Sequence, residues 1–161
     1  MVSEYPGEVA GGVGMQSGQS ENSKQLLRRL RESWNQSTGH PPPPGASEEQ
    51  VREFEVRYQV KLPLDLREYL QQMNGSGGMD GWMIDFWPIQ RIEPSSGTKL
   101  AGKWFDFADY SINASIYAIR LSNNLDDPNP IISAYGEGES MLAENFTEFV
   151  RRYLEDARSI L

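Results

Sequence analysis

The sequence predicts an α+β domain, and three observations lead to this fold class. Segments with helical periodicity come early in the chain, short segments with the alternation typical of β-strands follow, and another helical segment ends the chain. Helices and strands that are segregated along a chain in this way are typical of α+β proteins. The predicted strands are joined by short links, which favours antiparallel pairing because parallel strands need long crossovers.

The first 40 residues are expected to lie outside the main domain. Residues 1–19 are rich in Gly, Ser and Gln and lack periodicity, so we expect a disordered tail. Residues 20–40 contain an amphipathic helix and the start of a linker, and the four successive prolines that follow at residues 41–44 favour polyproline II. Such a run can be a ligand for an SH3-type or WW-type domain, but its place between two helices favours a stiff spacer. The apolar face of the helix is formed by Leu26, Leu27, Leu30 and Trp34.

Two helices are expected to open the main domain, which we place at residues 41–161. Ser47 and Gln50 form a capping box that marks the start of the first helix. Pro63 ends this helix because proline disfavours the helical conformation in the residue before it, and it also suits the first turn of the second helix. The second helix is expected to end at Asn74 and Gly75 with a left-handed cap.

The glycine-rich stretch after the second helix is interpreted as a turn. A phosphate-binding loop lies between a strand and a following helix, whose first amides face the phosphate. Here the order is reversed, because the glycines of residues 75–81 follow a helix and precede a strand. The stretch also lacks a P-loop lysine, so a phosphate site is disfavoured.

Strand-like alternation begins directly after these glycines. Residues 81–88 alternate in a way that predicts a first strand with one buried face. Three more strands are expected at residues 104–110, 115–121 and 130–135, and a final helix is expected after Asn145 as its cap. In the first strand, Trp82, Ile84 and Phe86 are expected to face the core, and Met83, Asp85 and Trp87 to face away from it.

The charge of the chain favours a basic protein as its partner. The formal net charge is −8, and residues 80–144 contain ten acids and four bases. This surface would repel nucleic acid, whose binding depends on Lys and Arg, but would attract a basic protein. No apolar run is long enough to span a membrane, and the first residues do not resemble a secretory signal. We therefore expect a cytoplasmic protein without a membrane partner.

The candidate catalytic residues are limited to carboxylates. The chain has no cysteine, and its single histidine, His40, lies in the proline linker, so no Ser-His-Asp or Cys-His arrangement is expected. Asp80 with Asp85, or Asp106 with Asp109, would suit acid–base hydrolysis if the fold placed the carboxyl groups about 5–9 Å apart. A small hydrolase therefore stays open as a third hypothesis.

The order of these motifs resembles the SUKH superfamily, a domain first named from yeast cell-wall assembly regulators. The shared motifs are a capped helix with Phe54 and Glu55, the Leu62–Pro63 pair, Asp65, the Asn74–Gly75 pair and a following strand that contains tryptophan. The segments FADYSINASIYAIRL and NFTEFVRRYL are similar to the central strands and the final helix of that family. The resemblance covers roughly residues 41–157 and depends more on the order of the motifs than on any one of them.

This resemblance implies an α+β fold with a mostly antiparallel, curved sheet, no cofactor and no known reaction. Many bacterial members are immunity proteins that neutralise a cognate toxin, often a nuclease, whereas eukaryotic members are regulatory scaffolds. The positions that match fold-defining ones are Leu62, Pro63, Asn74, Gly75 and Trp82.

The leading hypothesis is a non-enzymatic immunity protein that binds a basic toxin domain through an acidic surface. The alternative is a regulatory or scaffold module that shares the fold and has another partner. We expect the interface to contain Asp80, Asp85, Trp87, Asp106, Asp109, Tyr110, Glu137 and Glu139.

Overall fold

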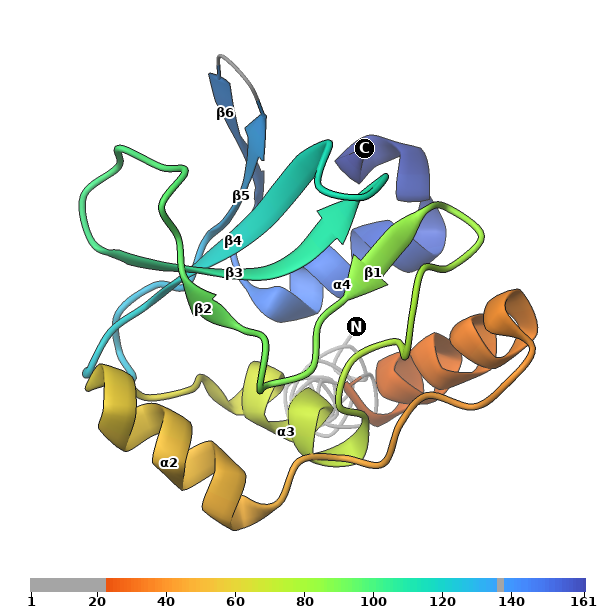
Figure 1. Cartoon of the computed structure of the whole chain (residues 1–161), viewed down its shortest axis with the longest axis horizontal. Helices are drawn as coiled ribbons and strands as arrows, with labels where there is room; N and C mark the ends of the chain where they lie inside the picture. Colours follow the sequence, from red (N-terminus) through yellow and green to blue (C-terminus); the bar gives the residue numbers. More distant parts are fainter. Residues whose placement is uncertain (1–22, 136–137) are drawn as a thin grey trace, which may run out of the picture.

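A computed structural model describes residues 23–135 and 138–161 and confirms the predicted α+β class (Figure 1). The predicted tail, residues 1–19, lies outside the described residues. A helix over residues 23–38 comes first. The later helices are α2 (Glu48–Tyr58), α3 (Leu64–Gln72), α4 (Phe146–Glu155) and the short 3-10 helix η1 (Ala157–Ile160).

Six strands form one antiparallel sheet in the order β1-β3-β4-β5-β6, with β2 beside β3. The three central strands lie within one residue of their predicted bounds. β1 is shorter than predicted, and β2 and β6 were not predicted. The strands are β1 (Ile84–Phe86), β2 (Glu93–Pro94), β3 (Lys103–Tyr110), β4 (Ser115–Leu121), β5 (Ile131–Tyr135) and β6 (Gly138–Ala143).

The main core lies between the sheet and α4, which Figure 1 shows behind β3 and β4. Phe149 of α4 is fully buried, and its ring lies 6.0 Å from Phe86, 5.4 Å from Phe107 and 5.4 Å from Tyr117, measured between centroids. Aromatic pairs at such distances add to the free energy gained by burying their apolar area. One face of β1, β3 and β4 is therefore covered by α4.

The amino-terminal helix packs on the same core. Its four predicted apolar residues are all buried and belong to the main core cluster, which confirms the predicted face. The indole Nε1 of Trp34 donates a hydrogen bond to the hydroxyl of Tyr153 at 3.0 Å, and its ring lies 4.9 Å from that of Phe86. Residues 23–38 thus close the core next to α4.

The end of the proline linker, residues 43–46, is bound to α3 and to the residues that follow it. Pro44 forms an antiparallel bridge with Met73, and the amide of Ala46 donates to the carbonyl of Leu70 at 2.7 Å. Between them, Gly45 lies so close to α3 that an added Cβ would be 1.8 Å from the carbonyl oxygen of Gln71. The backbone is thus engaged within the fold, as expected for a spacer.

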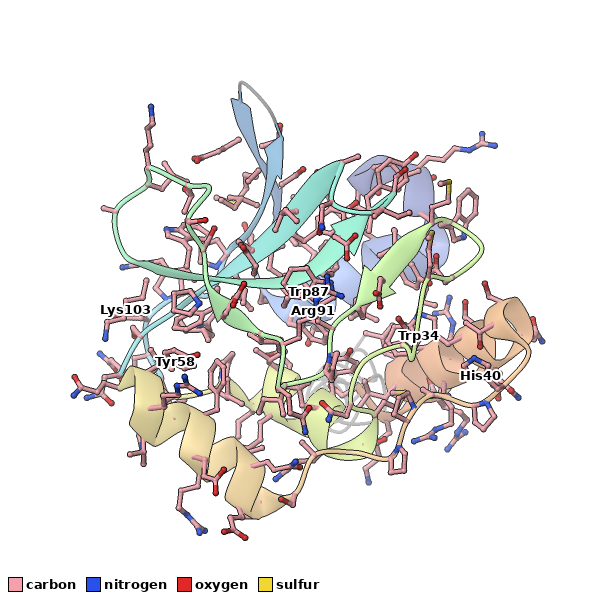
Figure 2. All side chains as sticks on the ribbon, viewed as in Figure 1. Trp34, His40, Tyr58, Trp87, Arg91 and Lys103 are labelled. Atoms are coloured by element: carbon pink, nitrogen blue, oxygen red, sulfur yellow. The ribbon has the colours of Figure 1, made fainter. Side chains whose placement is uncertain are left out.

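The predicted helix ends were wrong by a few residues. α2 ends at Tyr58, before Pro63, because Gln59 takes a left-handed conformation with a φ of 54°. Lys103 Nζ then donates to the carbonyl of Tyr58 at 3.3 Å, and Figure 2 shows this side chain at the end of α2. α3 ends at Gln72, since the next residue, Met73, is extended.

Asn74 and Gly75 stabilise the turn after α3, although Asn74 does not cap the helix. The Asn74 side chain accepts from the amide of Ile89 at 2.7 Å and donates to Gln90 Oε1 at 2.9 Å. Gly75 has a φ of 88°, and an added Cβ would lie 2.6 Å from the carbonyl oxygen of Phe86. Only glycine fits this close approach.

The predicted positions of the two tryptophans around β1 were wrong. Trp82 has an exposed fraction of 44%, whereas Trp87 is only 4% exposed. The carboxylate of Asp80 accepts hydrogen bonds from the amides of Trp82 and Ile84, which places Trp82 in a turn before the strand. The alternation therefore covers only Ile84, Asp85 and Phe86, and it does not describe the residues on either side.

We expect Gly45→Ala to lower the free energy of unfolding by about 1–3 kcal/mol, because the new methyl group would force the linker away from α3. Urea denaturation measures this change. Gly138→Ala is the matched control, since an added Cβ there meets no atom within 4 Å. Equal stability of the two variants would contradict the close packing of the linker.

Candidate protein-binding site on the open face of the sheet

The face of the sheet opposite α4 collects most of the predicted interface residues. Paired residues of neighbouring strands point to the same face, so the strand register defines this surface. In Figure 1 no labelled helix lies in front of β3 and β4, and we call this surface the open face. One row across it contains Asp85, Asp109, Ile116, Ala134 and Glu139. The next row contains Glu93, Asp106, Ala118, Ile132 and Met141.

Trp87 and Arg91 cover the β1 end of the open face. The Trp87 indole Nε1 donates to Asp109 Oδ1 at 2.6 Å, and the guanidinium carbon of Arg91 lies 4.0 Å from the centre of the indole ring. Arg91 Nη1 also lies 3.4 Å from Asp85 Oδ2. Figure 2 shows Trp87 and Arg91 together in front of the sheet. Asp109 is consequently only 4% exposed, and neither it nor Trp87 is the surface residue that we expected.

Two carboxylates of the open face lie in surroundings that oppose their charge. Burial raises the pKa of Asp85, and the nearby Asp109 raises it further. Burial also raises the pKa of Asp106, and the nearby Glu93 raises it further, whereas a hydrogen bond with Ser95 lowers it. The Oδ1 atom of Asp106 is buried and has no hydrogen-bond partner among the described residues. A cation placed beside these groups would stabilise their ionised forms.

Apolar side chains lie next to these acids. Trp104, Ala118 and Ile132 form a small buried cluster separate from the main core. Beside them is a hollow whose lining includes the exposed side chains of Leu100 and Met141. Apolar residues bordered by charged ones are common in protein interfaces.

The arrangement does not favour the hydrolase hypothesis. In each of the two predicted pairs one carboxylate is buried and hydrogen-bonded within the fold. Asp80 accepts from two backbone amides, and Asp109 accepts from the Trp87 indole. The hollow on this face is lined by one carboxylate, that of Glu139, together with the guanidinium of Arg120. Paired acid–base catalysis needs two carboxylates around one substrate position. Within residues 23–135 and 138–161, no group of three or more His, Asp and Glu side chains is placed to hold a metal ion.

Three residues of the predicted interface are not placed on this surface. Asp80 is buried, and its carboxylate accepts hydrogen bonds from two backbone amides and from the Tyr153 hydroxyl. Tyr110 pairs with Ile84 and packs against the main core, so it faces α4. Glu137 lies outside the described residues. The expected surface position of Asp80 was therefore wrong, and the half-buried Tyr110 lies on the opposite face of the sheet from the other predicted residues.

Arg91, Glu93 and Met141 were not identified from the sequence. Arg91 follows Trp87 by four residues and is one of only four bases in residues 80–144, which was the available signal. Met141 lies in β6, whose start is marked by Gly-Glu-Gly between two segments that alternate weakly. Glu93 lies in a strand of two residues, which is too short for any periodicity.

No helix in the described part of the chain is both long and apolar enough to span a membrane. Residues 45–152 match the model of the SMI1 / KNR4 family (SUKH-1). No curated protein matches the chain. The matched range runs from just before α2 almost to the end of α4 and includes every strand of the open face, but it excludes the helix over residues 23–38. Because the family model matches more than half of the chain, the chain belongs to the SMI1 / KNR4 family (SUKH-1).

Proposed function

We propose that this protein is an immunity protein that binds and neutralises a basic toxin domain, such as a nuclease, through the open face of its sheet. Membership of the SUKH-1 family supports a role in protein binding. We propose no reaction for the protein itself. Neutralisation would follow from occlusion of the toxin, since the acids of the open face would compete with the anionic substrate of a nuclease for its basic residues.

The observation that carries this proposal is that Asp85 and Asp106 hold carboxylates in surroundings that oppose their negative charge. Both carboxylates are partly buried, and both have raised pKa values. Among the described residues, Arg91 is the one cation paired with either carboxylate, and its Nη1 lies 3.4 Å from Asp85 Oδ2. A Lys or Arg of a partner that approached this face would relieve the repulsion and could donate to Oδ1 of Asp106, which has no hydrogen-bond partner among the described residues. The free protein thus keeps a charge arrangement that is more favourable in a complex.

A regulatory or scaffold module is the second candidate, because it would use the same face for a different partner. The two candidates differ in genetic context. A gene for a large toxin directly upstream supports the immunity role, and the carboxy-terminal domain of its product is the natural binding probe. The absence of such a neighbour would favour the regulatory role.

We expect Asp106→Asn to raise the free energy of unfolding at about pH 7. The pKa of Asp106 in the folded protein lies above the ordinary value of 3.8, so the folded state binds the proton more tightly than the unfolded state does. The stability of the parent protein therefore falls as the pH rises from 3.8 through the raised pKa, whereas the amide does not titrate. Urea denaturation across this range should show the advantage of the variant shrinking as the pH is lowered.

Asp126→Asn is the control for this measurement, because Asp126 is exposed in the loop between β4 and β5. Its stability should follow that of the parent protein at each pH. If Asp106→Asn were less stable than the parent at neutral pH, the carboxylate would be stabilising the fold, and the proposed unfavourable charge would be contradicted.

The double variant Glu93→Lys/Glu139→Lys should bind the upstream toxin domain with an association rate at least about tenfold lower at low salt. Both residues are exposed on the open face. The difference should shrink at about 0.15 M salt, because ions screen exposed charges. Stopped-flow fluorescence measures the rate, and co-expression with the toxin measures protection.

The matched control is Glu32→Lys/Glu155→Lys, which changes the net charge by the same amount as the first variant. Its two exposed residues lie away from the open face, on the amino-terminal helix and at the end of α4. Equal association rates for the two double variants would mean that net charge, and not the open face, directs the encounter. Unchanged protection by the first variant would argue against this surface.

A further inference from the structure

Four large apolar side chains are exposed where β1 begins and where β3 turns into β4. They are Met79, Trp82, Met83 and Ile112, with exposed fractions that range from 41% for Met79 to 77% for Ile112. The amide of Ser111 donates to the carbonyl of Met83 at 2.8 Å, which joins the two loops. We call these four residues the apolar corner. Single exposed apolar residues are common, whereas a group of them at one place indicates an interaction surface.

The backbone of the apolar corner is strained. Met83 has a φ of 66° and Ile112 a φ of 55°, both in the left-handed region. L-residues with a Cβ rarely adopt this conformation, and a β-branched residue such as isoleucine is least suited to it. Glycine or asparagine would form either turn with less strain. The presence of methionine and isoleucine at these positions therefore indicates a use for their side chains outside the turn itself.

Two buried carboxylates stabilise these strained turns. Asp80 Oδ1 accepts hydrogen bonds from the amides of Trp82 at 2.8 Å and Ile84 at 3.0 Å. The backbone carbonyl of Asp80 also accepts from the amide of Met83 at 3.0 Å. In the second turn, Asp109 Oδ2 accepts from the amide of Asn113 at 2.8 Å. Two buried carboxylates therefore stabilise the turns that leave these large apolar side chains exposed to water.

We infer that the apolar corner receives an apolar side chain of a protein partner whose neighbouring residues are Lys or Arg. This inference rests on the proposed function and assigns the corner to the same partner. The corner adjoins the open face, because Met83 directly precedes β1 and Asp85 lies within it. The partner would therefore contact the corner and the acidic rows together.

The charges around the corner define the chemistry of this partner. Asp80 lies in the turn before β1, Asp85 in β1 and Asp109 in β3. Arg91 lies 3.4 Å from Asp85 and 3.9 Å from Asp109. An excess of negative charge at an apolar patch favours a cationic rim on the partner. A second copy of this chain would bring the same carboxylates against each other, and nucleic acid would bring phosphates against them.

Binding of the upstream toxin domain to variants of the full chain tests this inference. Trp82→Ala and Ile112→Asn should each raise the Kd by at least about 30-fold, as for a residue at the centre of an interface. Leu64→Ser is the matched control, because Leu64 is an exposed apolar residue at the start of α3 and should bind like the parent chain. Isothermal titration calorimetry gives the Kd.

Thermal unfolding of the same variants separates binding from folding. Ile112→Asn should raise the Tm by about 2–4 °C, because asparagine adopts the left-handed conformation more readily than isoleucine. A lower Tm would assign Ile112 a structural role and overturn the inference. If the parent chain binds and the corner variants bind equally well, this inference fails and the proposed function stands. If the parent chain does not bind the toxin domain, both are overturned.

Discussion

Two carboxylates that have little access to water organise the part of the sheet where β1 begins and β3 ends. Asp80 accepts hydrogen bonds from the turn before β1 and from Tyr153 of α4, and that hydroxyl in turn accepts from Trp34 of the amino-terminal helix. Asp109 positions Trp87 and, through it, Arg91. A buried charge is tolerated only when its oxygens are hydrogen-bonded, so these partners cannot move independently.

This constraint explains how one small sheet presents both charge and apolar surface. Asp80 and Asp109 accept hydrogen bonds from the backbone of the turns of the apolar corner, while the carboxylates of Asp85 and Asp106 stay partly exposed beside them. The raised pKa values of these two acids and the left-handed conformation of Ile112 both oppose stability. Proteins commonly retain such unfavourable features where binding requires them. The open face and the apolar corner would then form one continuous surface for a basic partner.

Periodicity in the sequence predicted the helices, the central strands and the apolar face of residues 23–38, because each depends on neighbours a few positions away. The excess of acids in residues 80–144 led to the prediction of Asp85, Asp106 and Asp109 in one interface, and the strand register places them on one face. Neither pattern predicted that Asp80 and Asp109 are buried, since their partners Tyr153 and Trp87 are 73 and 22 residues away in the sequence. Trp82 and Trp87 were assigned to the wrong environments for the same reason. Trp82 is hydrogen-bonded to Asp80 and Trp87 to Asp109, and both lie outside β1, where the alternation no longer applies.

Amide hydrogen exchange tests the central claim most directly, with the chain measured alone and in complex with the carboxy-terminal domain of the upstream gene product. The proposed interface predicts that exchange slows on binding in the turn before β1, in the turn between β3 and β4, and around Glu93 and Glu139, while the exposed side of α2 is unchanged. Slowed exchange confined to α2 and the amino-terminal helix, with the open face unchanged, would contradict it.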